Sequence, residues 1–168
     1  MHPRNFAFAL GVTGFFAVAS VAHTWTATLQ SKDGSNISGS ARVEQVVKPT
    51  ADTAMPRDTT MPKDMKKDDG GYSATVTVTG AKPSTNLAWH VHQGKCAETP
   101  GAIVGRESDY AKLSTDDKGN GSVTSTLPIS LVERSEYSLS VHRGPDKASG
   151  VSACGDLVLT KTQAGLGQ

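Results

Sequence analysis

The chain has 168 residues, of which 36% are hydrophobic and 20% are charged, and its net charge at neutral pH is +1. Its 17 basic residues are balanced by 16 acidic ones, and no basic patch interleaves with aromatic residues. This composition argues against nucleic acid as a partner and suits one small globular domain.

The N-terminus has the features of a secretory signal peptide. Arg4 supplies a positive charge, and an apolar run without acidic residues follows it and ends in small residues. The run is short for a membrane span, so we expect cleavage after Ala22, or alternatively after Ala19, and no stable membrane anchor afterwards. Residues 1–22 are then the signal peptide, and residues 23–168 form one exported domain, periplasmic or extracellular. An uncleaved N-terminal anchor is the alternative.

Short segments of alternating polar and apolar residues recur along the exported part. The clearest, residues 72–79, alternates almost perfectly, as a strand with one buried and one solvated face does. Turns rich in glycine, proline and aspartate, such as Asp33-Gly34, separate these segments. The pattern predicts an all-β antiparallel sandwich or barrel. The predicted strands are 24–30, one within 37–47, 72–79, one around His90, 122–127, 136–142 and 156–162.

Two segments break the strand pattern. Residues 48–71 are rich in Lys, Asp, Thr, Pro and Met and bury too little apolar surface to offset their ordering entropy, so we interpret them as a mobile insertion. Their methionines Met55, Met61 and Met65 are candidates for copper capture because thioethers favour Cu(I); alternatively they are ordinary residues of a disordered insertion. The second break is a long loop over residues 97–112, and such loops are often functional.

The residues with the most chemical meaning are histidines and cysteines. His90 and His92 stand two apart in a strand-like run, so they share one face, roughly 6.5–7 Å apart, and can grip one metal ion. His142 ends another such run, and imidazoles suit copper, zinc, iron or nickel. In an exported chain, Cys96 and Cys154 are expected to pair.

These motifs, taken in order, resemble the copper/zinc superoxide dismutase family from about Thr26 to Leu159. The resemblance implies a Greek-key β-sandwich or flattened barrel of about eight strands with immunoglobulin-like architecture. It also implies a disulfide between the two cysteines, copper as cofactor at the three histidines, and superoxide as substrate. The matching motifs are Trp89-His90-Val91-His92-Gln93, Cys96, Val141-His142 and Ala153-Cys154-Gly155, with Asp116-Asp117-Lys118-Gly119 at the family's spacing after Asp109.

The chain departs from the family where the zinc chemistry lies. No histidine stands between His92 and His142, so the bridging histidine and the other zinc histidines are missing. Asp109 remains as a remnant of the zinc position, and one carboxylate is not a tetrahedral zinc site, so zinc is not expected. Val151 occupies the place of the family's active-site arginine. Arg143 and Arg106, the latter in the place of a family histidine, are candidates for anion steering.

Three functions remain open from the sequence. The first is an exported copper protein that dismutes superoxide, slowly because the bridging histidine and the arginine are absent. The second is a non-enzymatic copper carrier or buffer on the same fold, and the third is a metal-free structural module.

Overall fold

The computed structural model describes residues 22–46, 71–97 and 101–162. This part contains nine strands, two short 3₁₀ helices and no α-helix. The elements are β1 (Ala22–Ser31), β2 (Ser38–Gln45), β3 (Tyr72–Thr79), β4 (Asn86–Leu87), β5 (Trp89–Gln93), η1 (Glu107–Asp109), β6 (Leu113–Ser114), β7 (Gly121–Leu127), β8 (Tyr137–His142), η2 (Lys147–Ser149) and β9 (Val151–Thr162).

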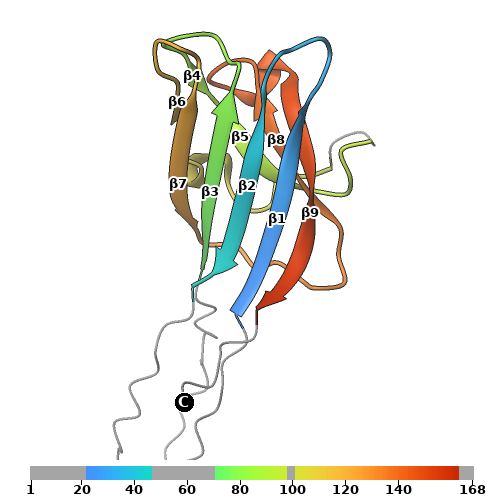
Figure 1. The fold of residues 1–168 in the computed structure, drawn as a ribbon. Helices are drawn as coiled ribbons and strands as arrows, with labels where there is room; N and C mark the ends of the chain where they lie inside the picture. Colours follow the sequence, from blue (N-terminus) through green and yellow to red (C-terminus); the bar gives the residue numbers. More distant parts are fainter. Residues whose placement is uncertain (1–21, 47–70, 98–100, 163–168) are drawn as a thin grey trace, which may run out of the picture.

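Seven strands form one antiparallel sheet in the order β5-β8-β9-β1-β2-β3-β7, and β4 and β6 form a small second sheet. The large sheet curls into a half-barrel, with β7, β3, β2 and β1 in front and β5 and β8 behind (Figure 1). The chain crosses from β3 to the far edge at β5 and returns from β7 to β8. The predicted all-β sandwich is thereby confirmed. The last strand is longer than predicted, because it begins at Val151 rather than at Asp156.

Alternation of side chains explains why the strands have these positions. In β3 the apolar residues of Tyr72–Thr79 are buried and the threonines between them are partly or fully exposed. At the tip of the first hairpin, Asp33 and Gly34 both have positive φ angles, 51° and 72°, which the predicted Asp-Gly turn accommodates. Trp25 and Trp89 are both buried to about the same degree, with 1% and 0% exposure, so Trp89 belongs to the core as the sequence suggested.

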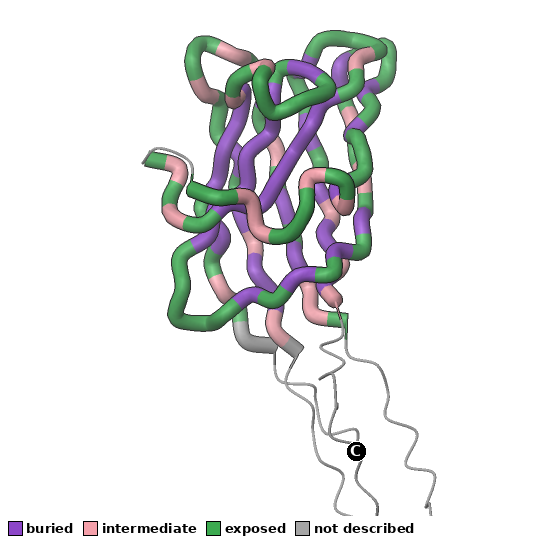
Figure 2. Tube along the Cα trace, turned by 180° about the vertical axis from the view of Figure 1, so that it is seen from behind, coloured by how far each residue is buried: buried purple, intermediate pink, exposed green. Residues whose placement is uncertain are grey.

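One region of the sheet is buried on both sides. All six residues of β8 and the first four of β5 are buried (Figure 2). Trp89 and Val91 face the core, whereas His90 and His92, which alternate with them along β5, point to the opposite face of the sheet. The loop that follows β5 pairs with its edge, where the amide of Val104 donates to Val91 and that of Gln93 donates to Ala102, and its Tyr110 ring packs against His90 with centroids 5.1 Å apart. The long loop predicted after β5 therefore covers the histidines.

Several predictions concern residues outside the described part. Residues 1–21 of the predicted signal peptide, residues 48–70 of the insertion, and Met55, Met61 and Met65 lie there, whereas Ala22 is the first residue of β1. The roots of the insertion are described, and the amide of Val46 donates to the carbonyl of Gly71 at 2.8 Å. No helix within the described ranges is long and apolar enough to cross a membrane.

Candidate metal centre

Three histidines from two neighbouring strands meet beside the barrel. His90 lies opposite Ser140 across the β5–β8 pair, and His142 ends β8. One nitrogen from each of His90, His92 and His142 lies within 4.8 Å of the others, and the three side chains are buried with 1%, 6% and 4% exposure. This geometry allows the three imidazoles to hold one metal ion. No other such group of His, Cys, Asp and Glu occurs in the described ranges.

The orientation of His92 points one free lone pair at this site. Its Nδ1 lies 2.9 Å from the carbonyl oxygen of Gly101, which can only accept, so Nδ1 carries the proton. In the neutral ring Nε2 is then an acceptor, yet it is buried and has no hydrogen-bond partner. Buried polar atoms are rarely left unpartnered. A ring nitrogen held in this tautomer by a carbonyl is the arrangement that metal-binding histidines normally show.

The imidazole rings of His90 and His142 are joined by a hydrogen bond between two of their nitrogen atoms. His90 Nδ1 and His142 Nε2 are 3.2 Å apart, so in the neutral rings one of them donates to the other. Burial, together with a smaller effect of the nearby His142, lowers the pKa of His90 to about 4. Burial also lowers the pKa of His142, with a contribution from His92. Both rings are therefore neutral at physiological pH, which is the state that binds metal.

An aromatic residue of the loop fixes the ring of His90. The ring of Tyr110 packs edge-on against His90 with centroids 5.1 Å apart, and against Trp89 at 5.0 Å. Its hydroxyl donates to the carbonyl of Val104, and burial raises its pKa to about 12. Tyr110 thus stays neutral and serves to pack the loop against the metal ligand.

The predicted disulfide joins the loop to the sheet beside this site. Cys96 and Cys154 are bonded, with Cα atoms 5.8 Å apart and a separation of 58 positions in sequence. The amide of Cys96 also donates to Asp156 at 2.7 Å, and Lys32 donates to the carbonyl of Cys96. A disulfide in the fold indicates an oxidising, extracytoplasmic compartment.

Asp109 and the two arginines are engaged in ion pairs. Arg106 binds Asp109 with two side-chain contacts, of 2.8 and 3.2 Å, and this holds the pKa of Asp109 below its usual value. Arg143 donates to the carbonyl of Asp33 at 3.2 Å and lies 3.6 Å from its carboxylate. The structure thus does not bring Asp109, Arg106 or Arg143 into the histidine cluster.

Sequence reasoning did not single out three residues that lie around the cluster. Gly101 orients His92 through its carbonyl oxygen. Glu107 on η1 forms an ion pair with Lys147 on η2 at 3.3 Å. Its carboxylate acts to raise the pKa of His90 and of His142, against the larger effect of burial. Only their location in the long loop, or just after His142, hinted at these roles.

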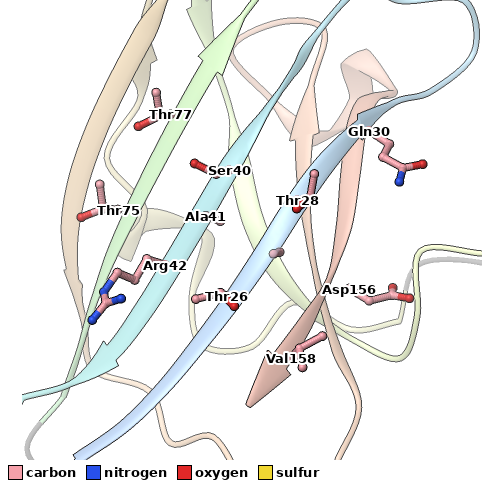
Figure 3. A pocket seen from close by; sticks show the side chains of 11 residues that line it. Thr26, Thr28, Gln30, Ser40, Ala41, Arg42, Thr75, Thr77, Asp156 and Val158 are labelled. Carbon is pink, nitrogen blue, oxygen red and sulfur yellow. The ribbon is translucent and has the colours of Figure 1, made fainter. Parts of the chain in front are cut away.

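The outer face of the large sheet carries a separate shallow hollow of about 790 Å³ (Figure 3). It crosses β1, β2, β3 and β9 and is lined mostly by short side chains such as Thr28, Ser40 and Thr77. None of the three clustered histidines lines it, so it is unrelated to the candidate metal centre.

Comparison with known proteins adds no assignment to this geometry. No family model matches the chain, and no curated protein matches its sequence. The functional argument consequently depends on the residues and their arrangement.

Proposed function

We propose that the chain is an exported copper-binding protein with a superoxide dismutase-like fold, and that its copper site reacts with superoxide. The observation that carries the proposal is the clustering of His90, His92 and His142, each with a ring nitrogen within 4.8 Å of the others, together with the buried Nε2 of His92, which has no hydrogen-bond partner while Nδ1 donates to Gly101. A site of three imidazoles without a carboxylate suits copper, which also has the highest affinity in the divalent series.

The donor set is suited to a metal that changes its oxidation state. Imidazole binds copper as Cu(I) and as Cu(II), so copper held by these three histidines would supply the one-electron exchange by which two superoxide ions and two protons become dioxygen and hydrogen peroxide. The chain's own part is to bind and to exclude water: His90, His92 and His142 supply the ligands, and Tyr110 and residues 101–104 cover them. The bridging histidine that takes part in proton delivery in the resembled family has no counterpart between His92 and His142.

A copper carrier or buffer is the second candidate. It is favoured by the ion pairs of Arg106 and Arg143, because neither guanidinium is free to attract an anion toward the histidines. The methionines of the insertion would have to reach the site from the other end of the sheet. Near the root of the insertion, Glu44 of β2 pairs with Thr24 of β1. The strand pairings that start at His90 cross β8 and β9 and reach β1 at Gln30, which is about 20 Å further along that strand.

Metal analysis of the protein purified from its native compartment tests copper binding. We expect one copper per chain in the wild type and in His23→Gln, and a loss of copper in His92→Ala. His23 is the matched control because it is a histidine outside the cluster, paired with Glu133 at 2.6 Å. Absence of copper from the wild type, or equal copper in His92→Ala, would reject the site.

A dismutation assay on the copper-loaded protein then separates the two candidates. An enzyme should exceed an equal concentration of copper bound to a short histidine peptide, and it should lose this excess in His92→Ala. Activity at or below that of the peptide complex would favour the carrier.

A further inference from the structure

The loop that covers the histidines is fastened to the sheet at both ends. At its first end, residues 101–104 run along the free edge of β5, where Ile103 bridges to His92 and Gly101 accepts from the same histidine. At its second end, the indole of Trp89 donates to the carbonyl of Ala111 at 2.8 Å. The span between these ends contains η1 and Tyr110, so the conformation of η1 determines how the tyrosine ring meets His90.

Both acidic residues of η1 are neutralised by basic side chains of the protein. Arg106, just before η1, binds the carboxylate of Asp109 through its guanidinium and through its backbone amide, at 3.3 Å. The Asp109 side chain is only 10% exposed, although Arg106 is 77% exposed. Glu107 reaches in the other direction to Lys147 on η2. The Arg106–Asp109 pair is formed within η1 and its N-cap, whereas the Glu107–Lys147 pair links η1 to the loop after His142.

A second contact joins the loop that carries η1 to the loop that carries η2. The ammonium group of Lys112 donates to the carbonyl of Pro145, just before η2. The loop between β5 and β6 and the loop between β8 and β9 are therefore linked at two points, on either side of Tyr110 in sequence. Each loop adjoins one of the strands that carry the clustered histidines.

A zinc ion does not fit the residues in this position. Among the described residues, His23 is the one histidine outside the cluster that could serve as a zinc ligand, and it is paired with Glu133. Asp109, the one carboxylate at the position of the resembled family's zinc site, already has both oxygens bound by Arg106. A structural zinc site needs about four nitrogen, sulfur or carboxylate ligands, and a guanidinium cannot be one of them.

We infer that the Arg106–Asp109 and Glu107–Lys147 ion pairs take the place of a zinc ion as the organisers of the loop beside the histidine cluster. Arg106 supplies the positive charge that a metal would supply to Asp109, and Lys147 supplies the link to the neighbouring loop. The inference builds on the proposed metal site, but it concerns the loop and not the metal's reaction. These residues are positioning residues, because they act on His90 through Tyr110.

Hydrogen exchange of the full, disulfide-bonded chain tests this role directly. We expect amides of residues 101–113 to exchange about two- to fivefold faster in Arg106→Gln and in Glu107→Gln, because each variant loses one ion pair whose basic partner is exposed to solvent. Arg106→Lys should restore part of the protection. Arg134→Gln is the matched control, since it removes an exposed arginine from another loop. In 1 M salt the wild type should approach the variants, because exposed pairs are screened.

Zinc titration of the copper-loaded protein provides the second readout. With the histidines occupied, we expect no further stoichiometric zinc and no added protection of residues 101–113. One equivalent of zinc that is lost in Asp109→Asn would overturn the inference, and so would equal exchange in Arg106→Gln, Glu107→Gln and the wild type. The exchange comparison is also made on the metal-free chain, so a failure of copper binding is distinguishable from a failure of the ion pairs.

Discussion

Acidification of the metal-free protein is the perturbation whose effect follows most directly from the histidine cluster. Burial lowers the pKa of His90 to about 4 in the folded state, whereas an unfolded chain titrates it near 6.5. As the pH falls from 6.5 to 4, the unfolded state takes up a proton that the folded state refuses. The stability contributed by neutral His90 is therefore complete above pH 6.5 and is lost toward pH 4, by about 3 kcal/mol.

This loss is a large fraction of the 5–15 kcal/mol that stabilises a typical domain. The assay is urea unfolding of the metal-free chain at pH values between 7.5 and 4, compared with His90→Gln. Protonation of carboxylates with lowered pKa, such as Asp109 and Asp116, also decreases the free energy of unfolding in acid, but these residues are present in both proteins. We expect the free energy of unfolding to fall by about 3 kcal/mol more in the wild type. Parallel pH profiles for the two proteins would refute the reasoning.

Two further predictions concern the covering loop. Replacing Cys96 and Cys154 together by serine should lower the free energy of unfolding by about 4 kcal/mol, because the closed loop spans 58 residues; reducing agent should then have no further effect on urea unfolding. Tyr110→Phe should cost about 1 kcal/mol, through the hydroxyl contact with Val104, and leave the copper spectrum unchanged. Tyr110→Ala should cost about 3–5 kcal/mol and shift that spectrum, since the ring packs against His90; an unshifted spectrum would remove Tyr110 from the site.

The fold was predictable because local patterns and global topology agree. The alternation in residues 72–79 and the Asp33-Gly34 turn each specify their structure locally. The candidate metal ligands were predictable for a related reason, since His90 and His92 are placed on one face by the period of a strand alone. His142 required a second strand to pair correctly with the first, and the antiparallel register of β5 with β8 provides that pairing.

Contacts made by the loop could not be predicted in the same way. A loop has no repeating geometry, so nothing in the sequence indicates that Glu107 meets Lys147, 40 positions further on. Arg106 and Arg143 look alike in sequence as candidates for anion steering. Their carboxylate partners, Asp109 and Asp33, are found only when the loops are placed in space.

The division between strand and loop also explains how the histidine cluster can be held in place without a metal ion in the loop beside it. His90, His92 and His142 lie on strands that the core holds, with Trp89, Val91 and Val141 at 0% exposure between or beside them. Their positions are therefore set by packing that involves no metal. The covering loop has no such support from the core, so its order depends on contacts of its own. An ion pair formed within η1 restores order locally, without disturbing the strands, so the histidine cluster and the covering loop need not change together.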